Sequence, residues 1–184
     1  FLDRQTPLLV LLVLIILLRL PNFFEPYWYG DEAIYLTLGN AMRNGEQLYT
    51  TIIDHKTPLI YYLAMVPNQF YFRILNLIWM LLTTSFFFIF AKKLFQKERW
   101  AFLASLILVF LTTLPWLEGN IPNGELFVMG FVMLGAVLFS KSSIFINFFK
   151  KEITINKTLS DGILLLVAGF MMGLGILTKV PALL

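Results

Sequence analysis

Residues 7–35 read PLLVLLVLIILLRLPNFFEPYWYGDEAIY and join an apolar run to a charged one. The apolar part, residues 7–24, would form a helix of roughly 27 Å, just enough to cross the hydrocarbon core of a bilayer. After it, Asp31 and Glu32 stand side by side, and apolar residues recur over 34–42 with the period of a helix. The stretch therefore predicts a membrane span followed by a polar loop that carries an amphipathic helix.

The composition indicates an integral membrane protein. Hydrophobic residues make up 59% of the 184 residues and charged residues only 14%, whereas a soluble domain usually has about 25% charged residues. The mean hydropathy is +0.79. There is no cysteine and a single histidine, which excludes disulfides, thiolate chemistry and histidine-rich metal centres. The net charge of +3 is small, and the excess of basic residues lies mostly on one side of the predicted membrane. It therefore gives no reason to expect a nucleic-acid partner.

The hydropathy pattern predicts one all-α domain over residues 1–184, a polytopic membrane helix bundle with an amphipathic first extracytoplasmic loop. A short apolar run at 59–66 cannot span a bilayer and is expected to be interfacial or re-entrant, with Tyr61 and Tyr62 at the level of the lipid headgroups. About five spans are predicted, at about 7–24, 70–90, 100–116, 126–139 and 162–180, with outer loops at 25–69 and 117–125.

The basic residues set the orientation. If the N-terminus and residues 92–99 and 140–161 lie on one side, that side carries most of the basic residues and few acidic ones. By the positive-inside rule this side is cytoplasmic, so the protein is predicted to be multi-pass with a cytoplasmic N-terminus and an extracytoplasmic site. The basic residues concerned are Arg4, Lys92, Lys93, Lys97, Arg99, Lys141, Lys150, Lys151 and Lys157.

Asp31 and Glu32 fall at the start of the predicted helix in the first outer loop. The partial positive charge of a helix N-terminus favours ionised carboxylates, so one interpretation is that the pair only caps the helix. The other is that a carboxylate at the membrane surface serves as a general base. The sequence around the pair leaves both interpretations open.

The other outer charges also have two interpretations. Arg73 and Lys179 stand at span ends, where long basic side chains often extend to phosphate headgroups. Glu125 is placed to cap the fourth span, and Glu118 is consistent with a solvated loop residue. His55, beside an aspartate, is typical of a surface residue as well as of a single metal ligand.

Taken together, these charges favour a functional cavity. Ionisable groups near a membrane core are expensive and usually pair, line a cavity or take part in function. Cations would neutralise a lipid phosphate and a carboxylate would accept the proton of an attacking hydroxyl. The candidate residues are Asp31, Glu32, Lys56, Arg73, Glu125 and Lys179.

The order of these motifs resembles the GT-C glycosyltransferases of the protein O-mannosyltransferase and aminoarabinose-transferase type. The resemblance extends over essentially the whole chain, which is expected to be the N-terminal part of a longer enzyme and inactive alone. The motifs are YGDEA at 29–33, GEQLY at 45–49, DHKTPLIYYL at 54–63, FRILN at 72–76 and GLGILTKVPA at 173–182.

Such enzymes move a sugar from a polyprenyl-phosphate donor to a lipid, glycan or protein hydroxyl on the outer face of a membrane, here a prokaryotic plasma membrane. The resemblance implies that Asp31 is catalytic, with Glu32 beside it. It implies that Lys56 lies near the donor phosphate, followed by Arg73, and that Glu125 is the acidic residue of the second outer loop. Lys56 is followed by a threonine and one proline where the family has two prolines.

The remaining expectations concern ligands and alternatives. Lys179 and Tyr61 complete the predicted substrate-contacting set, and membrane lipids are expected partners. A divalent cation such as Mg²⁺ or Mn²⁺ is a possible cofactor, with Asp31, His55 and Glu125 as candidate ligands. His55 stands where aminoarabinose transferases carry an acidic residue, which argues against that sugar. The alternatives are a non-catalytic relative and a transporter or flippase of lipid-linked substrates.

Overall fold

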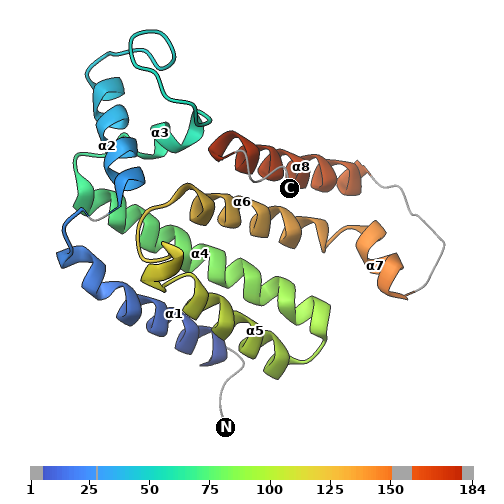
Figure 1. Ribbon diagram of the computed structural model, residues 1–184. Coiled ribbons are helices and arrows are strands. Elements are labelled where there is room, and N and C mark those ends of the chain that lie inside the picture. The colour runs from blue at the N-terminus through green and yellow to red at the C-terminus, as the bar shows by residue number, and fades with distance from the viewer. Residues whose placement is uncertain (1–5, 28, 151–158, 180–184) are drawn as a thin grey trace.

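The computed structural model describes residues 6–27, 29–150 and 159–179, and within them every regular element is a helix (Figure 1). The first helix continues directly into a 3-10 turn, and a second 3-10 turn precedes α6. The elements are α1 (Thr6–Arg19), η1 (Leu20–Phe24), α2 (Gly30–Arg43), α3 (Leu59–Leu63), α4 (Gln69–Phe95), α5 (Glu98–Leu111), η2 (Pro115–Leu117), α6 (Gly124–Phe139), α7 (Ser143–Lys150) and α8 (Leu159–Thr178).

The body of the molecule is formed by helices that lie side by side (Figure 1), namely α1, α4, α5, α6 and α8. The central helix α4 packs against α1, α5 and α6, and α8 packs against the far side of α6. Leu11, Ile15, Met80 and Val109 are fully buried between α1, α4 and α5. The apolar residues that face outward from these helices are exposed, as expected where lipid replaces water as the solvent.

Within the described residues, three helices are long and apolar enough to cross a membrane: Thr6–Phe24 with 19 residues, α4 with 27 and α8 with 20. The other two body helices are shorter, with 14 residues in α5 and 16 in α6. At about 1.5 Å per residue, neither covers the roughly 30 Å of a hydrocarbon core by itself. The predicted all-α class is confirmed and three spans are supported by length and composition, whereas the five-span count stays a prediction.

Three predicted boundaries differ from the structure by more than two residues. The span predicted at 70–90 continues to Phe95, so Lys92 and Lys93 lie in the last turn of α4 and not in a connecting loop. The span predicted at 100–116 ends early, because α5 stops at Leu111 and the chain turns through Thr112 before the 3-10 turn η2. The last helix begins at Leu159, before the predicted 162, and residue 180 lies outside the described residues. The basic residues Arg4, Lys151 and Lys157 also lie outside them.

Helices α2 and α3 form a separate layer at one end of the bundle (Figure 1). Their contact is close because Gly39 has no side chain: a Cβ there would come within 2.6 Å of the carbonyl carbon of Ala64. Tyr61 is fully buried in this layer, with its ring centroid 6.1 Å from that of Tyr35. The expectation that Tyr61 lies at the headgroup level is therefore wrong, and only Tyr62, 58% exposed, is placed to reach lipid.

The same end of the bundle gathers several chain segments. The C-terminal ends of α1 and α8, the N-terminal ends of α4 and α6, and the α2–α3 layer meet there (Figure 1). The α4–α5 and α6–α7 connections lie at the opposite end, with Lys92, Lys93 and Lys97. The predicted outer charges thus fall at one end and the described predicted inner ones at the other.

Candidate functional site

Glu32 and Arg73 form a buried ion pair that ties α2 to α4. The Nε of Arg73 lies 2.7 Å from Oε1 of Glu32, and its Nη2 lies 2.8 Å from Oε2. Gln69 donates a third hydrogen bond to this carboxylate at 3.1 Å. Both charged side chains are almost fully buried. Two parallel hydrogen bonds between planar groups fix the relative orientation of the helices.

Arg73 also donates to backbone carbonyl oxygens of η1 and of the residue that follows it. Its Nη1 donates to the carbonyl oxygens of Asn22 and, at 2.6 Å, Glu25. These bonds, with the pair to Glu32, satisfy the guanidinium inside the protein. The structure therefore gives both residues a supporting position, not the accessible one that a donor phosphate or a reacting hydroxyl would require.

Asp31 lies at the centre of a second cluster, one residue earlier on α2. Its Oδ1 is 2.6 Å from the Nζ of Lys56, and its Oδ2 accepts a hydrogen bond from the Tyr35 hydroxyl at 2.9 Å. The Nζ of Lys179 lies 3.7 Å from Oδ2. The cluster brings together α2, the loop before α3 and the end of α8, so the predicted proximity of Asp31, Lys56 and Lys179 is seen in the structure.

These partners set the charge state of Asp31. Partial burial alone would raise the pKa of the Asp31 carboxyl, but the hydrogen bonds from Lys56 and Tyr35 and the charges of Lys56 and Lys179 outweigh it. The pKa of Asp31 is therefore lower than its ordinary value. Burial and the neighbouring Asp31 charge raise the pKa of the Tyr35 hydroxyl, which stays a neutral donor. Asp31 is held ionised at neutral pH.

The loop before α3 holds Lys56 in place. The Tyr49 hydroxyl donates to the carbonyl oxygen of Lys56 at 2.5 Å, and the Lys56 ammonium lies 4.5 Å from the centre of the Tyr35 ring. Tyr61 donates from within the α2–α3 layer to Oδ2 of Asp54 at 2.6 Å. Tyr61 thus contributes to the cluster by holding the loop, and its buried hydroxyl is not presented to a substrate.

Lys179 connects the cluster to the start of α6. Its Nζ lies 2.6 Å from Oε1 of Glu125 and 3.3 Å from Oδ1 of Asn123. The approach depends on Gly124, where a Cβ would come within 2.8 Å of the Lys179 side chain. Glu125 is 48% exposed, so it faces solvent as well as Lys179. Glu125 therefore does more than cap α6, and Lys179 does more than extend toward lipid headgroups, because the two form an ion pair.

The side chains around Asp31 do not form a binding site for a divalent cation. Two ammonium groups face the carboxylate, and an ammonium donates hydrogen bonds only and repels a metal ion. His55 is exposed and lies 2.8 Å from Asp54. Among the described residues, no three histidine, aspartate or glutamate side chains gather closely enough to hold a metal. The expected ligand set of Asp31, His55 and Glu125 is not brought together.

Arg19 supports the site through the turn before α6, and it was not among the candidate site residues predicted from the sequence. It is buried at the end of α1, and its Nη2 donates to the carbonyl oxygens of Thr112 at 2.6 Å and Gly119 at 2.7 Å. Asn22 donates to the carbonyl oxygen of Asn120. These bonds hold the 112–120 turn against α1, and so position the segment that leads into α6.

The comparisons with known proteins add no relative. No protein family, no curated protein and no solved structure matches this chain. Its function must therefore be inferred from the geometry of the Asp31 cluster and from the motifs themselves.

Proposed function

We propose that this protein is a membrane glycosyltransferase of the GT-C type, which moves a sugar from a polyprenyl-phosphate donor to a lipid, glycan or protein hydroxyl. The observation that carries the proposal is the convergence of Lys56 and Lys179 on Asp31, from segments far apart in the chain. One carboxylate with two cations is the minimum that this reaction needs: a proton acceptor and positive charge for the leaving phosphate.

In the proposed reaction, the acceptor hydroxyl oxygen attacks the anomeric carbon of the donor sugar. The new C–O bond forms as the bond from that carbon to the phosphate oxygen breaks. The hydroxyl proton passes to the Asp31 carboxylate, and the electron pair of the broken bond stays on the polyprenyl phosphate. Asp31 then returns its proton to solvent, with no redox step.

The ion pairs at Asp31 couple donor binding to the strength of the base. Lys56 and Lys179 hold the pKa of Asp31 below its ordinary value while they face it. A donor phosphate between the ammonium groups draws them from the carboxylate, and the pKa of Asp31 rises. Because a stronger base accepts a proton more readily, Asp31 becomes an effective acceptor only after the donor is in place. Glu125 pairs with Lys179 until then.

The proposed orientation places this cluster outside the cell. Polyprenyl-phosphate donors are held in the bilayer by their chains, so the reacting phosphate lies at the membrane surface. This proposal is supported by the meeting of the ends of α1 and α8 and the start of α4 at the Asp31 end of the bundle (Figure 1), since ends of apolar helices are expected at the membrane surface. The positive-inside rule assigns the opposite, lysine-bearing end to the cytoplasm.

The test is sugar transfer from a panel of radiolabelled polyprenyl-phosphate donors, with the full-length protein in membranes. Asp31→Asn keeps a similar shape and removes the base, so turnover should fall by about 100-fold or more. Lys56→Met should lower turnover as well, because it removes a charge from the leaving group. Glu46→Gln, an exposed carboxylate in the 44–57 loop, is the matched control and should retain activity.

Equal turnover in wild type and Asp31→Asn would remove Asp31 from the chemistry and leave it as a structural ion-pair partner of Lys56 and Lys179. If wild type moved no sugar from any donor, the enzymatic proposal would fail. The same membranes would then be assayed for flipping of the labelled donors, which separates a transporter from a non-catalytic relative.

A further inference from the structure

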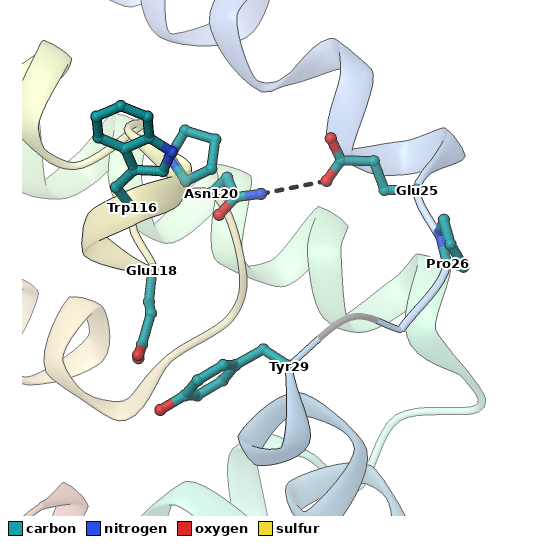
Figure 2. A pocket seen from close by; sticks show the side chains of 7 residues that line it. Glu25, Pro26, Tyr29, Trp116, Glu118 and Asn120 are labelled. Atoms are coloured by element: carbon teal, nitrogen blue, oxygen red, sulfur yellow. Dashed lines mark hydrogen bonds between the residues drawn. The ribbon is translucent and has the colours of Figure 1, made fainter.

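A cavity of about 540 Å³ opens between the segment after η1 and the turn before α6. Figure 2 shows Glu25, Pro26 and Tyr29 on one wall, with Trp116, Glu118 and Asn120 opposite them. The cavity is a different site from the Asp31 cluster. None of the charged residues of that cluster lines the cavity, namely Asp31, Lys56, Glu125 and Lys179. The two are linked through Asn123, which donates to Glu118 at 2.7 Å and contacts Lys179.

The cavity is acidic. Glu25 and Glu118 are its carboxylates, and no lysine or arginine is among its described lining residues. Oε2 of Glu25 accepts a hydrogen bond from Asn120 at 3.1 Å, and Oε2 of Glu118 accepts one from Asn123. Neither carboxylate forms an ion pair with a described basic side chain. Neutral amide donors thus hold two carboxylates whose charges are not compensated.

Aromatic groups line the same space. Trp116 is 98% exposed at the rim, and the Tyr29 ring points across the cavity toward Glu118 (Figure 2). A hydrogen bond to Glu118, together with burial and nearby carboxylates, raises the pKa of the Tyr29 hydroxyl to about 12, so this group stays a neutral phenol at physiological pH. An electron-rich ring face beside carboxylates attracts cations.

Asn120 supplies a second observation at this cavity, independent of the carboxylates. Its side chain is only 3% exposed, it lines the cavity, and its amide nitrogen is used by Glu25. Its Oδ1 is buried and has no hydrogen-bond partner among the described residues. A buried acceptor without a donor is costly, so the wall of the cavity holds a polar group that the described residues leave unsatisfied.

We propose that the cavity binds an organic ammonium group, with Trp116 and Tyr29 around the cation and Glu25 and Glu118 compensating its charge. A phosphate is excluded by the two carboxylates, and a purely apolar ligand would leave them without partners. The volume exceeds that of a bare ammonium ion, so part of the ligand enters with it. The ammonium can belong to a membrane lipid headgroup or to a soluble amine. This goes beyond the proposed function and does not depend on it.

The test measures binding to the purified full-length protein by tryptophan fluorescence and by thermal shift. The probes are choline, ethanolamine and 3,3-dimethylbutan-1-ol, which is a neutral isostere of choline. Choline and ethanolamine should bind saturably and the isostere at least about tenfold more weakly, because only the ammonium groups carry the charge. Equal binding of choline and its isostere, or saturable binding of none of the three, would overturn the proposal.

Variants place the binding in this cavity. Glu118→Gln and Glu25→Gln keep the size of each side chain and should each raise the dissociation constant for choline about tenfold. Trp116→Leu, at an almost fully exposed position, should weaken binding without unfolding the protein. Glu46→Gln is the control and should bind as wild type does. Unchanged binding in all three cavity variants would contradict the assignment.

A second arm identifies the source of the ammonium. The protein is placed in nanodiscs of phosphatidylglycerol alone, or of phosphatidylglycerol with phosphatidylethanolamine. If the headgroup is the ligand, added choline should bind more weakly in the mixed discs, because lipid competes for the cavity. If a soluble amine is the ligand, affinity should be the same in both discs. Sugar transfer is not measured in either arm, so a failure here and a failure of the glycosyltransferase assay are separate results.

Discussion

Two neighbouring carboxylates on α2 have different environments because of helix geometry. Successive residues of an α-helix point about 100° apart, so Asp31 and Glu32 cannot face the same partners. Glu32 points into the bundle and meets Arg73, whereas Asp31 points to the junction of α2, α8 and the loop before α3. One carboxylate is fixed by its partners in the interior, and the other remains within reach of a ligand.

The buried pair should behave as a unit in stability measurements. Glu32→Gln or Arg73→Met alone leaves a charge in the interior without its partner, and each should lower the free energy of unfolding by about 3–5 kcal/mol. The double variant removes both charges and should recover a large part of the loss. Denaturant unfolding in detergent measures all three variants. Additive losses in the double variant would show that the two side chains are not coupled.

The Asp31 cluster predicts a specific dependence on acid. Because the folded-state pKa of Asp31 is lower than its ordinary value of about 3.9, its ion pairs stabilise the fold fully above about pH 4. This contribution is lost as the pH falls through the folded-state pKa. Unfolding measured from pH 7 to pH 2.5 should therefore show a smaller acid-induced loss in Asp31→Asn than in wild type. Asp54→Asn should remove a second part of the acid-induced loss of stability. Burial would raise the pKa of Asp54, but this effect is outweighed, chiefly by the hydrogen bond from the Tyr61 hydroxyl, so this pKa is lowered as well.

At the scale of elements, the site depends on how closely α2 approaches the segment after α3. Gly39 lies against the backbone of Ala64, and this contact positions Tyr35 on one side and the Lys56 loop on the other. The α2–α3 layer is therefore a rigid support for the Asp31 cluster, although α3 has only five residues.

Replacing Gly39 with alanine should push α2 away from the backbone that follows α3. The new Cβ would meet backbone atoms, which cannot rotate away, so a loss of about 1–3 kcal/mol is expected in spite of the higher helix propensity of alanine. Gly169→Ala on α8 is the matched control: a Cβ there meets nothing within 4 Å, and the change should be neutral or slightly stabilising. Thermal unfolding in detergent measures both; equal melting temperatures would refute the packing argument.

What was predictable from the sequence depended on short-range patterns. Helical spans and the end at which the charges gather follow from local hydropathy and charge, and Tyr35 stands four residues after Asp31, a spacing that brings side chains together on a helix. By contrast, Arg19 binds the carbonyl oxygen of Thr112, 93 residues away. Contacts with backbone carbonyls leave no pattern in the amino-acid sequence, so this support was not foreseen. The burial of Glu32 depends on Arg73, 41 residues later in the chain, and was not foreseen either.

At the scale of the whole molecule, the two ends of the bundle differ in charge. At the Asp31 end Lys56 and Lys179 pair with carboxylates. At the opposite end Lys92 pairs with Glu98, whereas Lys93 and Lys97 are exposed and form no described ion pair. This asymmetry underlies the proposed orientation, with the lysine-bearing end in the cytoplasm.

The absence of cysteine makes the orientation easy to measure. Glu46→Cys and Lys97→Cys each introduce one thiol into residues 1–184 at an exposed position, one at each end of the bundle, and any cysteine elsewhere in the protein is replaced by serine. In intact cells a membrane-impermeant maleimide should label the cysteine at position 46, and should label that at position 97 only after permeabilisation. The reverse pattern would place the Asp31 cluster in the cytoplasm and contradict the proposed access to an outer lipid-linked donor.

The pairing of Glu32 with Arg73 also has a consequence for biogenesis. The two residues are 41 positions apart, and the chain leaves the ribosome N-terminal end first. After α2 has been synthesised, its carboxylate has no partner until α4 has been synthesised as well. The segment between α1 and α4 must therefore remain in solvent and dock late, so the formation of α4 is the step that fixes the final form of the site.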